Sequence, residues 1–381
     1  MHERFRGKRI VVAPDKFKGS LSAFEATKAI VEGIDAVAGG AEILASPIAD
    51  GGEGTAEVLC NAFGGIWRTI PVKDPVGRTI SARYCWAKSS QRSMAIFEMS
   101  EASGMWRLKL EELDPMRANT FGTGQMLREA VGTGVDRVMV GLGGSATNDA
   151  GIGMAAALGF RFLDRWNKEL EPIPAELDKL DRIEAPGSLN FPEIIAAVDV
   201  ANSLLGPNGA TKVYGPQKGA DPDQVMKLEA NLTHLANIVK RDLGFSDFHR
   251  EGTGAAGGLG FGLAAFCGAK FVPGFEVVAE AIQLEKKIAS ADLVITGEGK
   301  LDAQTLHGKG PAGVAKLAKK HRCPVIAFAG SVEDPKQFEG IFNAVIPIHR
   351  APVELDFALK NAASLLRSSA EEAIKELFLN L

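Results

Sequence analysis

Six glycine-rich segments of this 381-residue chain place acids, amides, hydroxyls and lysines close together. In chain order they are D-K-F-K-G-S, A-D-G-G-E-G-T, G-G-S-A-T-N-D, G-P-Q-K-G-A, G-T-G-A-A-G-G-L-G and T-G-E-G-K-L-D. Glycine lets the backbone approach a ligand closely and point its N–H groups at phosphate oxygens. Carboxylates in the same segments suit the divalent cation that accompanies a nucleotide. The segments therefore predict a site for an anionic, metal-bridged ligand, and phosphoryl transfer as its chemistry.

The first two segments follow predicted strands over residues 9–13 and 42–48. In open α/β sheets, ligands bind beyond the carboxyl ends of the strands. Lys16 and Lys18 at such an end predict an anion site, although a solvated turn would carry the same residues. Asp50, after the second strand, predicts a cation ligand or a proton acceptor. The alternative is that Thr55 caps the next helix and that Glu53 only favours its dipole.

The third segment is the one richest in side-chain hydrogen-bonding groups. It joins a predicted strand over residues 136–141 to an amphipathic helix, and Asp149 can cap that helix. Ser145, Thr147 and Asn148 offer donors beside its free N–H groups. We predict that these four residues bind the substrate.

Two further segments supply a candidate base and another lysine. Asp199 ends the apolar run I-I-A-A-V-D-V, where partial desolvation raises the proton affinity of a carboxylate. A turn cap is an equally good interpretation of Asp199. Gln217 and Lys218 resemble the first segment, again with a lysine for an anionic oxygen.

The remaining segments suit a nucleotide and its metal ion. Glu298 and Asp302 bracket a glycine and a lysine after a buried strand, which fits Mg²⁺ together with phosphate. The residues that we predict to contact the cofactor are Gly297, Glu298, Gly299, Gly257 and Gly258. The histidines do not cluster, and no H-E-x-x-H spacing occurs.

Alternating strand and helix patterns must position these segments. Residues 9–63 read as βαβα, with a capping box at Ser22 and Glu25, and the same rhythm returns from residue 293 onward. The middle reads as antiparallel hairpins over residues 67–99, then as helix, strand, helix and strand. An apolar stripe over residues 355–377 predicts one last helix. We predict an α/β fold: a discontinuous Rossmann-like parallel-sheet domain (1–65 plus 285–381) with a second α/β mixed-sheet domain inserted (66–284), and the active site in the cleft between them.

Composition excludes several other classes of protein. With a net charge of −4, the chain lacks the excess of positive charge that binding to nucleic acid or to an anionic membrane would require. No apolar stretch is long enough for a signal peptide or a membrane span, so we expect a cytoplasmic location. The four cysteines lie far apart without C-x-x-C spacing, which argues against a disulfide framework or zinc site and favours buried thiols. The oligomeric state stays open.

One motif supports a competing interpretation. The pattern G-x-G-x-x-[GA] occurs three times, and at Gly141 it follows a predicted strand with Asp164 about twenty residues further on, as in dinucleotide sites. However, T-N-D-A-G separates these glycines from the helix. No Walker A sequence G-x-x-x-x-G-K-[ST] is present, so a P-loop kinase in its usual form is excluded.

Taken in order, the motifs resemble the bacterial type I glycerate kinases. They are D-K-F-K-G-S-L-S, I-A-D-G-G-E-G-T, D-P-V-G-R, T-F-G-T-G, G-L-G-G-S-A-T-N-D-A-G, V-D-V-A-N-S-L-L-G, G-P-Q-K-G-A, G-A-A-G-G-L-G and V-I-T-G-E-G-K-L-D-A-Q-T. The resemblance covers nearly the whole chain, from about residue 8 to about residue 375. Two changes depart from the family pattern: alanine follows the N-D pair where glycine is common, and V-A-N-S-L stands for V-x-N-P-L. Neither change removes a charged group.

The resemblance implies ATP- and Mg²⁺-dependent phosphorylation of D-glycerate, usually on the 2-hydroxyl, by two α/β domains. The loops fit such a reaction, with Lys18, Asp50 and Asp199 as catalytic candidates and Lys16 as a substrate ligand. Two other functions compete with it: an NAD(P)-dependent oxidoreductase of a small hydroxy acid using the G-L-G-G-S-A loop, and a metabolite-sensing binding module without turnover.

Overall fold

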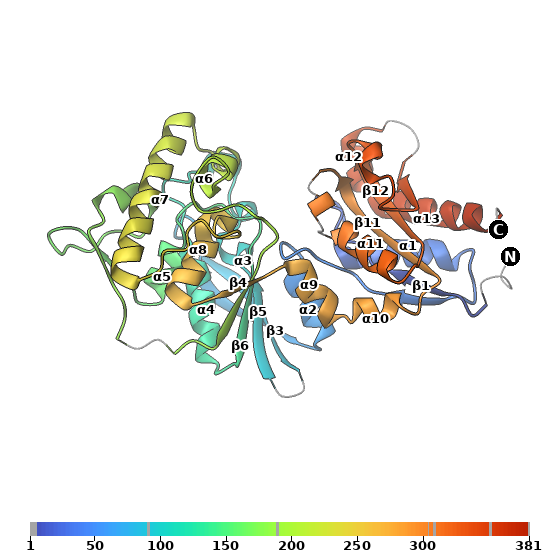
Figure 1. Ribbon diagram of the computed structural model, residues 1–381, viewed down its shortest axis with the longest axis horizontal. Helices are drawn as coiled ribbons and strands as arrows, with labels where there is room; N and C mark the ends of the chain where they lie inside the picture. Colours follow the sequence, from blue (N-terminus) through green and yellow to red (C-terminus); the bar gives the residue numbers. More distant parts are fainter. Residues whose placement is uncertain are drawn as a thin grey trace. The chain divides into compact units, whose positions relative to one another are not determined.

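The structure is a computed structural model that describes residues 6–89, 92–187, 190–303, 305–307, 310–349 and 353–379. The chain divides into two compact units, and Figure 1 traces both from the N-terminus to the C-terminus. The first unit comprises residues 1–50 and 275–381, and the second comprises residues 51–274. Each unit has its own central sheet.

The first unit is built on a five-stranded sheet in which all neighbouring strands are parallel. Its strands, in spatial order, are β13 (Ala344–Pro347), β12 (Val325–Val332), β11 (Leu293–Leu301), β1 (Arg9–Val12) and β2 (Glu42–Ala45). Its helices are α1 (Ala23–Asp35), α9 (Gly274–Ala281), α10 (Leu284–Ile288), α11 (Gly310–Lys320), α12 (Leu355–Lys360) and α13 (Ala362–Leu379).

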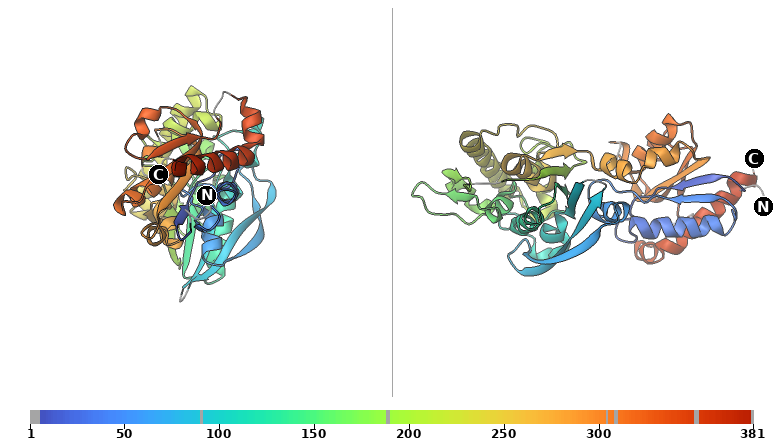
Figure 2. Two further views of the ribbon diagram at one scale, coloured as in Figure 1. Left: turned by 90° about the vertical axis from the view of Figure 1, so that its right-hand side faces the viewer. Right: turned by 90° about the horizontal axis from the view of Figure 1, so that it is seen from below.

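Helices cover both faces of this sheet. Figure 2 shows α1 and α13 together on one face, with α11 on the other. Ile30 and Ile34 of α1 share a buried core with Leu366 and Ile374 of α13. Gly33 permits this close approach, because a Cβ there would lie 2.3 Å from the carbonyl oxygen of Arg367. The predicted capping box is confirmed: Ser22 and Glu25 bond each other's backbone N–H groups at the start of α1.

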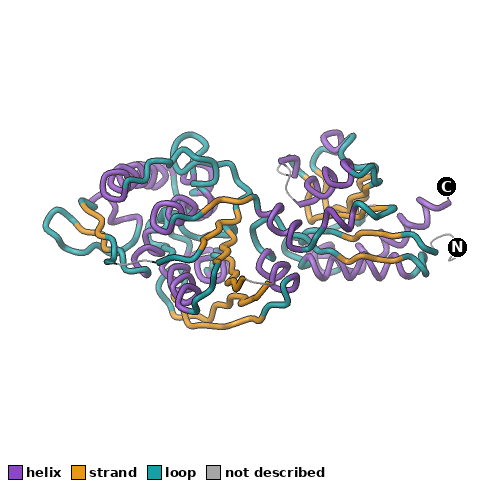
Figure 3. Tube along the Cα trace, turned by 60° about the horizontal axis from the view of Figure 1, so that its bottom comes forward, coloured by secondary structure: helices purple, strands orange, loops and turns teal. Residues whose placement is uncertain are grey.

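The second unit contains a mixed six-stranded sheet. Its spatial order is β10 (Lys270–Val272), β9 (Glu193–Ala197), β6 (Arg137–Gly141), β5 (Arg92–Glu98), β4 (Thr79–Ser89) and β3 (Ile66–Lys73). The pairs β3–β4 and β4–β5 are antiparallel, whereas β5, β6, β9 and β10 run parallel (Figure 3, strands in orange). A small antiparallel pair, β7 (Arg161–Leu163) and β8 (Arg182–Glu184), lies outside this sheet.

The helices of the second unit are α2 (Thr55–Ala62), α3 (Ser100–Ser103), α4 (Phe121–Gly132), α5 (Ile152–Ala157), α6 (Ala210–Tyr214), α7 (Pro222–Leu243) and α8 (Ala255–Cys267). Tyr84, Phe97, Val140 and Phe261 are among the residues of its buried core. A discontinuous parallel-sheet unit with a mixed-sheet α/β unit inserted is the predicted fold class, which is thereby confirmed.

Three local predictions are wrong. The apolar stripe over residues 355–377 forms two helices, α12 and α13, separated at Asn361. The glycine-rich G-E-G-K-L stretch is the end of β11 rather than a loop, because it continues to pair with β12 as far as Leu301. Cys60 and Cys85 form a disulfide, with Cα atoms 5.8 Å apart, that joins α2 to β4. Cys267 and Cys323 are buried free thiols, as expected.

Membrane-spanning helices were sought along the described ranges. Within them, every helix is too short or too polar to cross a bilayer.

Candidate active site

In the first unit, polar residues gather where β1 and β11 end. Gly299 lies directly against the first glycine-rich segment, since a Cβ on it would be 2.9 Å from the backbone nitrogen of Lys18. Gly310, at the start of α11, lies against Asp15 in the same way: a Cβ on Gly310 would be 3.0 Å from Oδ2 of Asp15. These contacts bring three stretches of sequence together at one sheet edge.

A group of four carboxylates, which we call the carboxylate cluster, surrounds this edge: Asp15, Asp50, Glu298 and Asp302. Lys16 is placed among them, with its Nζ 3.8 Å from Oδ1 of Asp15 and 3.6 Å from Oδ1 of Asp50. Asp15 is almost fully buried, and its Oδ1 also accepts the backbone N–H of Lys16 at 2.6 Å. Lys16 therefore partly neutralises a negative centre, and Lys18 is exposed beside it.

Glu298 is an acid of this cluster with a strongly raised pKa. Its pKa is raised to about 8, chiefly by burial and in smaller part by the nearby carboxylates of Asp15, Asp50 and Asp302. Thr305 opposes the shift by donating its hydroxyl to Oε1 of Glu298 at 2.7 Å. A carboxyl group whose pKa is raised by burial and by neighbouring like charges is one that a bound cation would ionise.

The chemistry of these donors fits Mg²⁺ held jointly with phosphate. Magnesium is commonly bound by one or two carboxylates, with substrate phosphates and water completing its octahedron. Glu298 and Asp302 are near enough for their charges to interact, as a shared cation requires. Among the described residues, no group of three or more His, Cys, Asp or Glu side chains forms a complete metal cage.

In the second unit, the residues Gly51–Gly54 form a loop across the carboxyl ends of three parallel strands. A Cβ on Gly51, which has φ of +98°, would lie 2.6 Å from Oδ2 of Asp199 after β9. A Cβ on Gly141, at the end of β6, would lie 2.8 Å from the carbonyl oxygen of Gly51. The Gly51–Gly54 loop therefore lies beside the ends of β6 and β9, as the position of the glycine-rich segments led us to expect.

The loop from Gly143 to Asp149, called here the S-A-T-N-D loop, surrounds a buried lysine. Lys218 is 2% exposed, and its Nζ donates to Oγ of Ser145 and to the carbonyl oxygen of Thr147, both at 2.7 Å. Burial lowers the pKa of Lys218 to about 7, against the attraction of the Asp149 carboxylate. The predicted lysine and the predicted hydroxyl loop thus lie together.

Two atoms of the S-A-T-N-D loop are buried and make no hydrogen bond: Oγ1 of Thr147 and Oδ1 of Asn148. The Asn148 amide is nevertheless oriented, because its Nδ2 donates to Oγ1 of Thr211 at 2.9 Å. Buried polar atoms normally have partners, so unsatisfied ones mark a place where a polar ligand or a water belongs. This is the observation in the second unit that points most directly to ligand binding.

Asp149 has a different task from its neighbours. Its fully buried carboxylate accepts the backbone N–H and the hydroxyl of Thr120 and the N–H groups of Gly151 and Gly153, at 2.7–3.1 Å. Burial raises its pKa while these bonds lower it. The predicted helix cap is confirmed, and it serves the starts of both α4 and α5.

The other predicted residues lie as follows. Asp199 accepts the backbone N–H of Gly274 at 3.0 Å, and Gln217 is exposed beside Lys218. Gly257 and Gly258 have φ of +68° and +85° in an irregular first turn of α8. Gly257 packs against Thr147, whose carbonyl oxygen would be 1.9 Å from a Cβ there. Gly297 and Gly299 belong to β11.

Sequence reasoning missed three residues that hold the site: Glu98, Thr211 and Thr305. Each bonds a predicted loop residue or its backbone. Glu98 ends a predicted strand, and that position was the one signal available to find it. Thr211 carries no pattern of its own, whereas Thr305 is the last residue of the motif V-I-T-G-E-G-K-L-D-A-Q-T, which was a signal for it.

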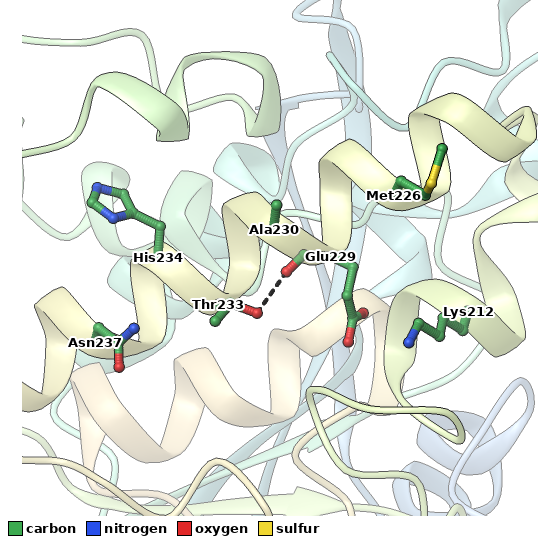
Figure 4. Close-up of a pocket in the computed structure, with 7 residues that line it drawn as sticks. All are labelled: Lys212, Met226, Glu229, Ala230, Thr233, His234 and Asn237. Atoms are coloured by element: carbon green, nitrogen blue, oxygen red, sulfur yellow. Dashed lines mark hydrogen bonds between the residues drawn. The ribbon is translucent and has the colours of Figure 1, made fainter.

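A surface pocket of about 550 Å³ lies elsewhere in the second unit, along α7 (Figure 4). It is lined by Lys212, Met226, Glu229, Ala230, Thr233, His234 and Asn237. No residue of the six segments borders it.

The hydrogen bonds of Asp164 contradict the oxidoreductase interpretation, which requires this carboxylate to bind a ribose. Its Oδ1 accepts the backbone N–H groups of Trp166 and Lys168, at 2.8 and 2.9 Å, in the turn after β7. This carboxylate caps a turn and is 7% exposed, so it is not presented to a ribose.

A carboxylate cluster beside Lys16 in one α/β unit, and a buried lysine bonded to a hydroxyl in the other, are the kinds of groups used by enzymes that transfer phosphoryl groups. The model of the glycerate kinase family matches residues 10–378. The chain therefore belongs to the glycerate kinase family, and the predicted resemblance is confirmed. This membership also excludes a binding module without turnover.

Relatives of known name cover nearly the whole chain. A glycerate kinase of Halalkalibacterium halodurans is 41% identical over 369 residues, covering 95% of this chain and 96% of the relative. A glycerate 2-kinase of Escherichia coli is 41% identical over 329 residues, covering 86% of each. A solved structure of a glycerate kinase 2 from Salmonella typhimurium LT2 is similar with a TM-score of 0.85 and 40% identity, covering 98% of this chain and 99% of that one.

Proposed function

We propose that the chain transfers the γ-phosphoryl group of ATP, with Mg²⁺, to a hydroxyl of D-glycerate, giving 2-phosphoglycerate and ADP. The S-A-T-N-D loop carries the proposal. Its oriented amide, its unsatisfied buried oxygens and Lys218 suit a small hydroxy acid. Similarity to a relative named glycerate 2-kinase supports the choice of the 2-hydroxyl.

The reaction asks chiefly for positioning and for neutralisation of charge. Mg²⁺–ATP supplies the phosphoryl group and neutralises part of its charge. Glu298 and Asp302 would hold the metal ion, while the backbones of Gly297, Gly299, Gly257 and Gly258 approach the nucleotide. Lys16 and Lys18 would bind anionic oxygens of the γ-phosphate or of the glycerate carboxylate.

On the acceptor side, the hydroxyl oxygen attacks phosphorus, the bond to the β-phosphate oxygen breaks and ADP leaves. Ser145, Thr147, Asn148, Gln217 and Lys218 would orient glycerate, and Asp149 would fix their loop. Asp50 or Asp199 would accept the hydroxyl proton, a role worth about 10²–10⁴ in rate. Because these residues are divided between the two units, the proposal requires both units to contribute to one reaction.

The test is ADP release from ATP with D-glycerate, measured with and without Mg²⁺. We expect turnover that depends on both, and a phosphorus NMR spectrum of the product that matches 2-phosphoglycerate. The 3-phosphoglycerate spectrum would move the proposal to the other hydroxyl. An absence of turnover across a panel of small hydroxy acids would refute it.

A further inference from the structure

We propose that Glu98 is a positioning residue of this active site, which acts by fixing the Gly51–Gly54 loop. The inference rests on the proposed function only for its kinetic readout. Glu98 lies at the end of β5, outside all six glycine-rich segments.

Glu98, at the end of β5, caps the N-terminus of the helix α2. Its Oε1 accepts the backbone N–H of Gly54 at 2.9 Å and that of Ala56 at 3.1 Å. The residue before α2, Gly54, has no side chain to do so, and it has φ of +92°. A carboxylate at a helix N-terminus satisfies free N–H groups and interacts favourably with the helix dipole. Glu98 therefore replaces the local cap that α2 lacks.

The loop in front of α2 is also held by close backbone packing. Gly143 leaves room for Gly52, whose Cα would be 2.8 Å from a Cβ on Gly143. The N–H of Gly51 donates to Oγ1 of Thr55 at 3.0 Å. Because this packing leaves little slack, a shift at Gly54 is transmitted to Gly51 and to the preceding residue, Asp50. Asp50 is part of the carboxylate cluster.

The far end of α2 is anchored separately. Cys60 is bonded to Cys85 of β4, and Val58 is 2% exposed. Loss of Glu98 therefore leaves α2 attached to its sheet and frees the loop end alone. Misplacement of a reacting group by about 1 Å costs roughly 10²-fold in rate. The consequence of losing Glu98 is thus expected in kcat rather than in folding.

The experiment compares Glu98→Ala, Glu98→Gln and a matched control, Val58→Ala. Glutamine keeps an oxygen that can accept both N–H groups, and Val58→Ala removes buried methyl groups from the same helix without touching either bond. We expect Glu98→Ala to lower kcat for D-glycerate roughly 10–100-fold with little change in KM for ATP. Glu98→Gln should recover kcat to within about 5-fold of the wild type. Val58→Ala should lower the unfolding temperature at least as much as Glu98→Ala while it keeps kcat.

Hydrogen exchange of the Gly54 and Ala56 amides gives a readout that does not depend on the substrate. We expect exchange at both to be at least about 10-fold faster in Glu98→Ala and close to the wild type in Glu98→Gln. Wild-type kcat or wild-type exchange in Glu98→Ala would overturn the inference, as would a kcat loss in Val58→Ala equal to that in Glu98→Ala. Equal inactivity of the Gln and Ala variants would also overturn it, because the loss would then not follow from the two hydrogen bonds that glutamine keeps. If the wild type does not turn over glycerate, the proposed function fails and exchange alone decides the inference.

Discussion

At the scale of single residues, the buried lysine of the second unit is the most unusual group. Lys218 lies beside the S-A-T-N-D loop. There its ammonium group donates hydrogen bonds to one hydroxyl and one carbonyl oxygen instead of to water. A buried ammonium group is expensive unless it is paired, and Asp149 is the one carboxylate that raises its pKa. Because burial lowers its pKa to about 7, the ammonium group of Lys218 loses its proton near neutral pH.

This has a measurable effect on stability. The pKa of Lys218 falls from 10.5 in an unfolded chain to about 7 in the folded one, so the unfolded state binds more protons between these values. Stability contributed by this group therefore rises with pH from about 7 to 10. Relative to Lys218→Met, the wild type should gain at least about 1 kcal/mol in the free energy of unfolding across that range. Urea unfolding at pH 7 and pH 10 measures it.

The exposed Lys227 provides the control, since Lys227→Met should leave the pH dependence of stability unchanged. A Lys218→Met variant whose stability follows pH in parallel with the wild type would contradict the assignment.

Several site residues were accessible from sequence because their signals are local. Asp149 stands two and four residues before the N–H groups that it caps, and that spacing alone predicts a helix start. Glu98 bonds groups 44 and 42 residues away, and Thr211 bonds Asn148 63 residues away. Such partners are decided by how the sheet is ordered, which no local pattern records.

At the scale of elements, one carboxylate sets the starts of two helices. Asp149 joins Thr120, which precedes α4, to the first turn of α5, and the hydroxyl of Thr120 accepts the N–H of Met154 at 2.9 Å. The S-A-T-N-D loop is thereby tied to two helices at once. The position of the S-A-T-N-D loop is therefore set mainly by its bonds to the starts of α4 and α5.

We therefore expect Asp149→Ala to lower the free energy of unfolding by about 3–5 kcal/mol, because it leaves several buried N–H groups without an acceptor. Chemical denaturation of the purified variant measures this loss. Asp136, which is exposed, is a similar acceptor for the N–H and hydroxyl of half-buried Ser93, and Asp136→Ala should cost no more than about 1 kcal/mol. Equal costs for the two variants would show that burial does not matter here.

The periodicity of apolar residues predicted which segments are helices and which are strands, but it did not locate two of the element ends. The α1 start carries its own capping box, so sequence located it. The end of β11 is glycine-rich and looks like a loop, but hydrogen bonding to β12 keeps it extended. The apolar stripe that predicted one C-terminal helix continues across Asn361, so periodicity concealed the break between α12 and α13.

At the scale of the whole molecule, the glycine-rich segments divide between the two units. The first and last segments meet at the carboxylate cluster, which Asp50 of the second segment joins. The rest of the second segment and the three others belong to the second unit, where Gly52 packs against Gly143 and Lys218 bonds Ser145. The chain passes from one unit to the other between Asp50 and Gly51 and between Gly274 and Phe275. The predicted domain boundaries near residues 65 and 285, and the predicted cleft, stay predictions.

The central claim is that charge-neutralising residues of both units serve one phosphoryl transfer to D-glycerate. The most direct measurement is kcat for Mg²⁺-dependent ADP formation with D-glycerate in Lys18→Ala and Asp50→Asn of the first unit and Thr147→Val of the second. We predict that each variant lowers kcat by about 10²-fold or more while its unfolding temperature stays near that of the wild type. Wild-type kcat in the variants of either unit would contradict the account.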